Sequence, residues 1–123
     1  MPHFGRTSVE RINTVHKDLR EVLYAAIEDF DFSVICGKRG EDEQNEAFAA
    51  GRSKLKWPES KHNQTPSHAV DIAPFPLDWS DIESFKDMAT VVLEKATQAG
   101  VPLRWGGNWV NFRDYPHFEL LDE

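Results

Sequence analysis

The sequence is poor in cysteine, since Cys36 is the only one among 123 residues. A single thiol excludes an internal disulfide and any zinc site that is built from several cysteines. Cys36 ends the apolar run Phe32–Cys36, and we therefore expect a buried, unreactive thiol.

The sequence also lacks an excess of positive charge. It has 14 Lys and Arg residues against 21 Asp and Glu residues, so its formal net charge is -7. Proteins that bind nucleic acids generally neutralise phosphates with clustered Lys and Arg side chains. The charge balance therefore argues against a nucleic-acid partner and against a nuclease.

Long hydrophobic runs are missing as well. No apolar stretch is long enough to span a bilayer, and residues 1–6 lack the apolar region of a secretory signal. With 40% hydrophobic residues, the chain can still bury a sizeable core. We expect a single domain over residues 1–123 that is monomeric and does not insert into membranes.

Residues 8–29 are predicted to form one long amphipathic helix. Apolar side chains recur there every three or four positions, which is the period of a helix with one buried face. Thr7 and Glu10 have the spacing of a capping box at its start. His16 lies beside the apolar stripe among charged neighbours, and we expect it to be a solvated helix residue rather than a ligand.

Two further helices are expected. One follows a second capping box, formed by Ser80 and Glu83, and ends at Gly100. The other is the Ala- and Glu-rich segment 41–50, with Gly51 as its left-handed stop.

Outside these helices the sequence predicts short strands at 32–36, 69–73, 102–105 and 117–121. A few helices with several short strands are typical of an α+β domain. We predict a compact α+β fold with a small antiparallel sheet and flanking helices.

The most informative stretch is 60–71, which contains His62, His68 and Asp71 within twelve residues. A loop rich in Asn, Thr, Pro and Ser leads there into a predicted strand. Zinc accepts imidazole nitrogen and carboxylate oxygen, and a catalytic site uses about three protein ligands and a water. His117 is the other histidine in a comparable setting. From spacing alone, a catalytic zinc site and a set of structural histidines remain equally open.

Two motifs resemble those of a known family. The residues SKH at 60–62, followed by AVD at 69–71, resemble the S-x-H…A-x-D signature of zinc D-Ala-D-Ala dipeptidases and carboxypeptidases. DYPH at 114–117 resembles the second signature of that group. The run 66–74 is most similar to the phage endolysin branch, the L-alanyl-D-glutamate peptidases. The resemblance extends over residues 34–120.

The resemblance implies a fold like that of the hedgehog and D-Ala-D-Ala peptidase group, with a zinc ion held by three side chains. These ligands would be His62, Asp71 and His117. Asp114 would be the general base, and Arg39, just after a predicted strand, would contact the substrate. A solvated loop arginine without a partner is the alternative for Arg39.

The choice between His62 and His68 needs a separate argument. The nine residues from His62 to Asp71 exceed the commonest spacing of the family, so counting alone does not decide. The residues Ser60 and Lys61 match the signature and favour His62. If the strand already includes position 68, the odd separation sends His68 and Asp71 to opposite faces. We predict that His62 is the ligand.

Other assignments have alternatives. Glu119, two positions along a strand from His117 and on the same face, is the second candidate for the base. Asp114 could instead cap a turn or pair with Arg113.

The surroundings of the motifs are less decisive. The basic and aromatic loop 52–59 either forms the rim of a cleft or is solvated. Residues 106–109 are predicted to be a loop with unusual backbone freedom because of two glycines. Trp105 and Trp109 either line a groove or pack in the core.

The function that these expectations favour is hydrolysis of a peptidoglycan stem peptide by a zinc-dependent endolysin, at the L-alanyl-D-glutamate bond. The alternatives are a D-Ala-D-Ala dipeptidase or carboxypeptidase and a non-catalytic, zinc-stabilised wall-binding or virion module. The resemblance further implies synthesis in the host cytoplasm without a signal peptide, and access to the wall after release by a holin.

Overall fold

The computed structural model describes residues 2–109 and 113–121. In this part of the chain the elements are α1 (Arg6–Ile12), α2 (Lys17–Ile27), β1 (Phe32–Cys36), α3 (Glu41–Ala49), the 3-10 helix η1 (Lys61–Asn63), β2 (Ala69–Pro74), α4 (Ile82–Ala99), β3 (Leu103–Trp105), the 3-10 helix η2 (Gly106–Asn108) and β4 (His117–Leu120). The predicted α+β class with a small antiparallel sheet is confirmed.

The four strands form one antiparallel sheet in the order β1-β2-β4-β3. The central strand β2 pairs with β1 on one side and with β4 on the other. Its register with β4 places Asp71 directly opposite His117. Side chains that face each other across an antiparallel pair have Cβ atoms about 4.5–5.5 Å apart. The register therefore brings together two residues that are far apart in the sequence.

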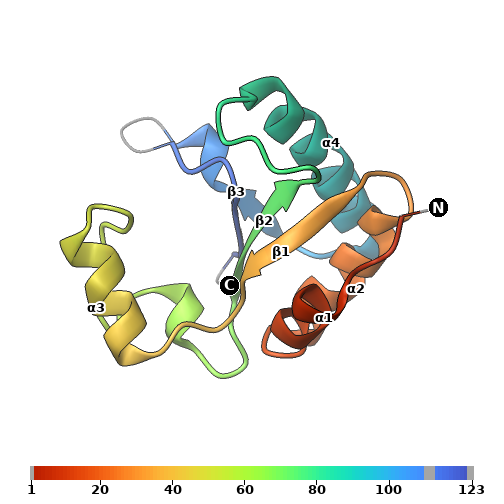
Figure 1. The fold of residues 1–123 in the computed structure, drawn as a ribbon. Coiled ribbons are helices and arrows are strands. Elements are labelled where there is room, and N and C mark those ends of the chain that lie inside the picture. Colours follow the sequence, from red (N-terminus) through yellow and green to blue (C-terminus); the bar gives the residue numbers. More distant parts are fainter. Residues whose placement is uncertain (1, 110–112, 122–123) are drawn as a thin grey trace.

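The two faces of the β2–β4 pair have different environments, because successive strand residues point to opposite faces. Val70, Ile72 and Phe118 are fully buried and pack in the core. Asp71 and His117 alternate with them and line a cleft on the other face. Figure 1 shows α1, α2 and α4 grouped to one side of the strands and α3 on the opposite side.

The core is built by the apolar stripes of α2 and α4 against the sheet. Its largest fully buried side chains include Leu19, Leu23, Phe85, Met88, Ile72 and Phe118. Burial of one such side chain contributes roughly 1.5–3 kcal/mol relative to its exposure. This packing buries one face of the β2–β4 pair and leaves the other face to the cleft.

The prediction of one helix over residues 8–29 is wrong, because α1 ends at Ile12 and α2 starts at Lys17. The intervening segment is bonded to the loop before β2. The Ser67 amide donates to the Thr14 carbonyl at 2.9 Å, and the His16 amide donates to the Ser67 carbonyl at 2.8 Å. These bonds to a distant segment replace helical hydrogen bonds, although the apolar period continues through the break.

The capping box predicted for Thr7 and Glu10 is also wrong. The N-cap of α1 is Gly5, and no side chain caps the helix. His16, expected to be a solvated helix residue, is instead the N-cap of α2, where its Nδ1 accepts a hydrogen bond of 3.0 Å from the Asp18 amide. His16 therefore satisfies one of the amides that a helix start leaves without an intrahelical partner.

At the start of α4 the helix is predicted correctly but its cap is not. The N-cap is Asp81, whose carboxylate accepts from the Ser84 amide at 3.1 Å. Ser80 is engaged in the preceding turn, where both its amide and its hydroxyl donate to the carboxylate of Asp78. The expected box between Ser80 and Glu83 therefore does not form.

The predicted helix stops are confirmed. Gly51, just after α3, has a φ of 79°, and Gly100 at the end of α4 has a φ of 72°. Only glycine adopts this left-handed conformation without a steric cost. Among the described residues, no helix combines the length and the apolar composition that crossing a membrane requires.

Candidate metal centre and active-site cleft

Three side chains converge where η1, β2 and β4 meet. One ligand atom from each of His62, Asp71 and His117 lies within 4.8 Å of the others. His62 Nε2 is 3.2 Å from Asp71 Oδ1, and His117 Nδ1 is 3.1 Å from the same oxygen. These are the three residues that the sequence motifs singled out as metal ligands.

His62 is oriented by one hydrogen bond of its backbone amide and one of its ring. Its amide donates to the hydroxyl of Ser60, the N-cap of η1, at 3.2 Å. On the ring, Nδ1 donates to the Gly37 carbonyl at 2.8 Å. The other nitrogen, Nε2, consequently faces Asp71. His62 is only 2% exposed, so the ring has little freedom to turn.

Gly37 makes this arrangement possible for a steric reason. A Cβ at this position would lie 2.3 Å from Thr14 Oγ1 and 2.6 Å from the Arg11 carbonyl oxygen. Any larger residue would therefore push the end of β1 away from the end of α1. Because the Gly37 carbonyl accepts a hydrogen bond from the His62 ring, this displacement would also move a candidate metal ligand.

His117 is oriented in a similar way at the start of β4. Its Nε2 donates to Glu119 Oε1 at 2.8 Å, while Nδ1 faces Asp71. The ring of Trp109 packs against it with a centroid distance of 5.1 Å. Glu119 lies on the same face as His117, as predicted, but its carboxylate contacts the imidazole nitrogen that points away from Asp71.

The donor set fits a zinc ion. Zinc takes imidazole nitrogen and carboxylate oxygen, and three protein ligands leave a coordination position for water or substrate. Metal-binding histidines usually donate their second N–H to a carbonyl or a carboxylate, which fixes the ring and the tautomer. His62 does so to Gly37, and His117 does so to Glu119.

The electrostatics of the site follow from the same contacts. Burial by itself would lower the pKa of His62, but the Asp71 carboxylate raises it to about 10. The pKa of His117 is also raised, because its hydrogen bonds to Asp71 and Glu119 outweigh burial. The two histidines in turn hold the pKa of Asp71 well below its usual value, against the effect of its burial. Metal binding must therefore displace protons from the imidazoles.

Asp114 lies beside the three ligands without belonging to the group. Its carbonyl accepts from the His117 amide at 3.1 Å, which closes a turn through Tyr115 and Pro116. Its side chain lines the cleft. Burial, followed by the negative charge of Asp71, raises the pKa of Asp114 to about 6. A carboxylate with a pKa near the working pH is suited to proton transfer.

The two glycines before this turn are required for space rather than for backbone freedom, which corrects the prediction for residues 106–109. They lie in η2 and neither has a positive φ. A Cβ on Gly106 would lie 2.4 Å from the Asp114 carbonyl oxygen and 3.1 Å from His117 Cβ. Gly106 thus allows the turn that carries Asp114 and His117 to pack against η2.

Arg39 has specific partners, so the alternative of an unpartnered loop arginine is wrong. Its guanidinium donates to Gln44 Oε1 at 2.9 Å and to Asp71 Oδ2 at 3.4 Å. Gln44 is fully buried and also accepts from the Asn63 side chain at 3.1 Å. This network links α3, η1 and β2. The sequence analysis did not single out Asn63, because no motif marks a buried amide that bridges distant segments.

His68 is placed elsewhere. Its amide donates to the Lys61 carbonyl at 3.0 Å. Its ring forms an edge-to-face contact with the ring of His16 at a centroid distance of 5.1 Å. The strand starts at Ala69, so the alternation argument does not reach position 68. His68 is nevertheless absent from the group of ligand atoms around Asp71.

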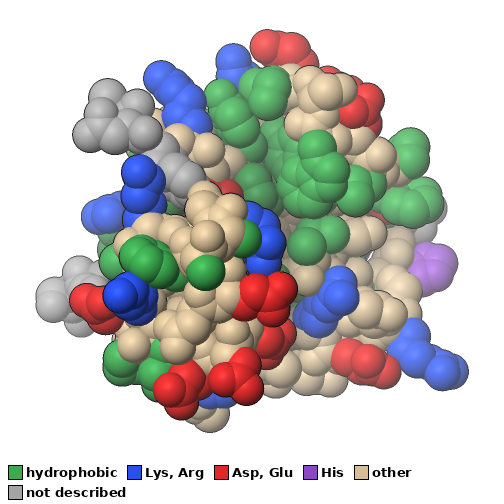
Figure 2. Space-filling view, turned by 60° about the vertical axis from the view of Figure 1, so that its left-hand side comes forward, with side chains coloured by type: hydrophobic (Ala, Val, Ile, Leu, Met, Phe, Trp, Pro, Cys, Tyr) green, Lys and Arg blue, Asp and Glu red, His purple; other side chains and the backbone are tan. Residues whose placement is uncertain are grey.

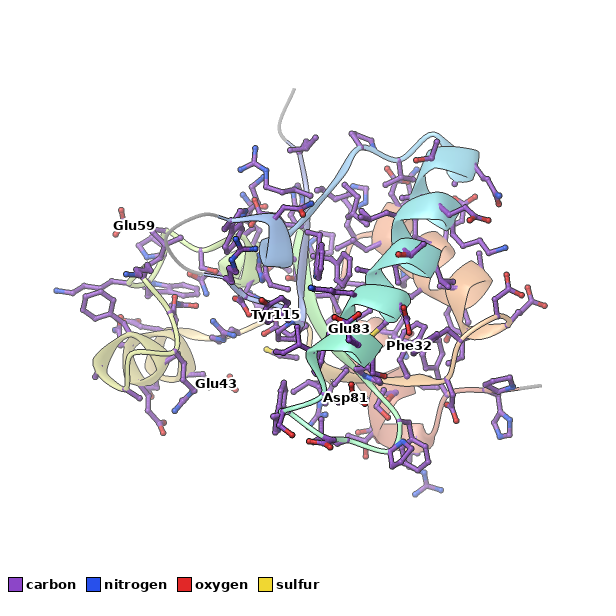
Figure 3. All side chains as sticks on the ribbon, turned by 90° about the horizontal axis from the view of Figure 1, so that it is seen from above. Phe32, Glu43, Glu59, Asp81, Glu83 and Tyr115 are labelled. Carbon is purple, nitrogen blue, oxygen red and sulfur yellow. The ribbon has the colours of Figure 1, made fainter. Side chains whose placement is uncertain are left out.

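The three candidate metal ligands lie in a cleft of about 1210 Å³. Its lining includes Glu43 and Ala47 of α3, Arg52 and Glu59 of the following loop, and Asp71 and His117 of the sheet. Figure 3 shows Glu43 and Glu59 on the side of α3, apart from Tyr115, which lies next to the sheet. Part of the loop 52–59 therefore forms a rim of the cleft, which was one of its two predicted roles.

The structure also places the two tryptophans and the cysteine that the sequence analysis discussed. Trp109 lines the cleft, whereas Trp105 packs in the core against Phe118. Cys36 is partly exposed and also lines the cleft. The expectation of a buried thiol is wrong, because the last residue of β1 lies at the edge of the cleft rather than in the core.

Comparisons with known proteins agree with this geometry. The crystal structure of Serratia marcescens L-Ala D-Glu endopeptidase ChiX matches with a TM-score of 0.84 and 31% identity, covering 98% of this chain and 91% of that chain. Peptidoglycan L-alanyl-D-glutamate endopeptidase CwlK of Bacillus subtilis is 32% identical in an alignment of length 112 that covers 79% of this chain. The match spans 65% of that relative's length. A family model described as phage L-alanyl-D-glutamate peptidase matches residues 1–121, and the chain belongs to this family.

Proposed function

We propose that the protein is a zinc-dependent peptidoglycan endopeptidase that hydrolyses the L-alanyl-D-glutamate bond of the stem peptide. The observation that carries the proposal is the group of three ligand atoms, from His62, Asp71 and His117, within 4.8 Å of one another in an open cleft. The membership of the family supports the choice of bond. The names of both relatives specify the same linkage.

His62 would hold zinc through Nε2, Asp71 through a carboxylate oxygen and His117 through Nδ1, the atoms that face one another. Zinc bound there would supply Lewis-acid activation of the scissile carbonyl and of a water. Asp114 would take the proton of the attacking water and return it to the leaving amine. Its place beside the ligands and its raised pKa support this role.

Arg39 would hold a carboxylate of the substrate or stabilise the developing oxyanion. D-glutamate in a stem peptide offers such a carboxylate. Gln44 and Asp71 each accept one guanidinium hydrogen bond, and a guanidinium has five N–H donors. Among the described residues these are the hydrogen-bond partners of the guanidinium, so its other donors would serve a substrate while Gln44 and Asp71 keep its plane in place.

The surface supports a peptide substrate over a nucleic acid. Figure 2 shows acidic and basic side chains interspersed on the face that carries α3, without a continuous basic area. Phosphate binding requires clustered positive charge. The proposal includes action as a monomer on the wall, after synthesis in the host cytoplasm and holin-type release.

The test is digestion of purified peptidoglycan, followed by mass analysis of the released peptides and identification of new amino termini. We expect new termini at D-glutamate, and their loss when a chelator removes the metal. His62→Ala protein is the control for contaminating hydrolases. New carboxyl termini at D-alanine, without new termini at D-glutamate, would identify a D-Ala-D-Ala peptidase instead. No release by zinc-loaded protein would favour a non-catalytic wall-binding module.

A further inference from the structure

A partly buried ion pair lies beside the candidate metal ligands, on the side of His117 that is remote from Asp71. Glu119 Oε1 accepts the hydrogen bond from His117 Nε2 at 2.8 Å. Its second oxygen, Oε2, is 3.4 Å from Lys61 Nζ. The carboxylate therefore uses one oxygen for the histidine and the other for the lysine.

This pair is removed from solvent to an extent unusual for Lys and Glu. The side chains of Lys61 and Glu119 are 19% and 13% exposed. Charged groups of this kind are rarely buried unless they are paired. Lys61 Nζ also donates to the Leu120 carbonyl, so the ammonium is anchored to the backbone of β4. The carboxylate is consequently held in a defined orientation.

The pair also connects the two segments that supply the histidines. Lys61 precedes His62 in η1, and Glu119 follows His117 by two residues in β4. The link from Lys61 through Glu119 to His117 therefore ties the turn that carries one histidine to the strand that carries the other.

Resting on the metal site of the proposed function, we propose that Glu119, held by Lys61, is a positioning residue that keeps Nδ1 of His117 directed at the metal. A half-turn of the ring about the Cβ–Cγ bond would put Cδ2 in the place of Nδ1 and Cε1 in the place of Nε2, so the turned ring would present carbon to Asp71 and to Glu119. The carboxylate of Glu119 accepts only from an N–H, so it retains hydrogen on Nε2 and leaves Nδ1 free of hydrogen in the metal-bound state. Glu119 acts through His117 and does not touch the substrate.

This role differs from that of the second candidate base, which the sequence analysis assigned to Glu119. A base must reach the attacking water on the open side of the metal. Glu119 also lines the cleft, but both oxygens of its carboxylate are engaged, one by His117 and the other by Lys61. Asp114 is a further carboxylate beside the candidate ligands. The geometry points to orientation of a ligand rather than to proton transfer.

The test measures zinc affinity of the full chain by competition with a chromogenic chelator. Loss of a carboxylate that orients a metal-binding histidine typically weakens metal affinity about 10- to 100-fold, and we expect this for Glu119→Ala. Glu119→Gln preserves size and one acceptor oxygen but loses the charge that strengthens both hydrogen bonds. We expect its zinc affinity to lie between those of the wild type and Glu119→Ala.

The matched control is Glu83, which forms an exposed ion pair with Lys86 at 3.6 Å on α4. Glu83→Ala and Glu83→Gln remove the same groups without contacting a metal ligand, and should leave zinc affinity unchanged. Lys61→Met tests the second half of the proposal. It should weaken zinc binding less than Glu119→Ala, because the carboxylate remains but is no longer held.

A spectroscopic measurement separates positioning from simple stabilisation. In zinc-loaded wild type, the ¹⁵N signals of His117 should show a protonated Nε2 and a metal-bound Nδ1. In Glu119→Ala they should show a mixture of ring orientations. A purely structural ion pair would lower the melting temperature and leave both zinc affinity and these signals unchanged. That result, in either folded Glu119 variant, overturns the proposal.

The zinc-binding results can be told apart from a failure of the proposed peptidase activity. Should Glu119→Ala fail to fold, Glu119→Gln decides, and wild-type zinc affinity in it overturns the proposal. Absence of zinc binding by wild-type protein overturns both the positioning role and the proposed metal site. Digestion of peptidoglycan is scored separately, so zinc binding with the expected variant effects but without digestion supports the positioning role and removes only the activity.

Discussion

The two faces of the β2–β4 pair are formed by alternating residues of the same two short strands, but they are stabilised by different kinds of interaction. One face packs Val70, Ile72 and Phe118 into the core, and the other presents Asp71 and His117 to the cleft. The apolar face depends on buried volume, because dispersion and hydrophobic burial are not directional. The polar face depends on the positions of individual atoms, because hydrogen bonds and metal bonds are directional. Substitutions on the polar face should therefore change zinc binding and turnover, whereas those on the apolar face should change stability.

Removal of a ligand from the polar face should have the largest effect. His62→Ala deletes a ligand atom that lies 3.2 Å from Asp71, and we expect loss of stoichiometric zinc and of all turnover. His68→Ala is the matched control, because its ring contacts His16 instead. Metal analysis and peptidoglycan digestion check both variants. Retained zinc in His62→Ala together with lost zinc in His68→Ala would reverse the assignment.

A change beside the ligands should lower turnover while sparing the metal. Asp114→Asn removes the ability to accept a proton, so turnover should fall about 10²- to 10⁴-fold, the usual contribution of a general base. Zinc content and the folded state should stay near those of the wild type, because Asp114 lies outside the ligand group. Kinetics and metal analysis on the same preparation are required. Full activity, or an equal loss of zinc, would contradict the role as base.

The protonation state of the polar face should make zinc affinity depend on pH. Since the pKa of His62 is raised to about 10 and that of His117 is also raised, zinc must displace protons at neutral pH. Affinity should rise about tenfold per pH unit for each proton displaced. Titration calorimetry in buffers of different ionisation enthalpy counts these protons. Zinc affinity that does not change between pH 6 and pH 8 would contradict the raised pKa values.

In protein without zinc, the raised pKa of His62 should make the stability fall, rather than rise, with increasing pH. The folded-state pKa of His62 lies above its ordinary value of 6.5, so the charged imidazole contributes stability that is fully present below pH 6.5. This contribution is lost as the pH rises towards about 10. Denaturant unfolding of chelator-treated protein should show this decline. An increase in the His62-dependent contribution over this range, measured against His62→Ala, would refute it.

A change on the apolar face should have the smallest effect on the chemistry. Ile72→Ala removes a fully buried side chain and should cost about 2–5 kcal/mol of stability, as comparable substitutions do. Below its lowered melting temperature, the folded variant should keep zinc affinity and turnover close to the wild type, because the register of β2 with β4 comes from backbone bonds. Loss of zinc from folded Ile72→Ala would show that the two faces are coupled.

Sequence patterns predicted the local elements where the physical cause is itself local. The strand β1 and the helix α3 lie within a residue of their predicted bounds. Gly51 and Gly100 end helices because a left-handed residue is needed there. The break between α1 and α2 was missed, because the bonds from Ser67 that cause it come from a segment far away in the chain.

By itself the sequence determined the α+β pattern, the alternation of core and site residues in β2 and β4, and the motifs that named His62, Asp71 and His117. These depend on the period of the backbone and on residue identity. The tertiary structure alone decided that Gly37 and Gly106 are needed for space, that Arg39 is anchored by Gln44, and that Glu119 accepts a hydrogen bond from His117 Nε2. Such roles depend on contacts between segments that are distant in sequence. No local pattern encodes them, because the partner of each group is set only when the sheet and the helices pack.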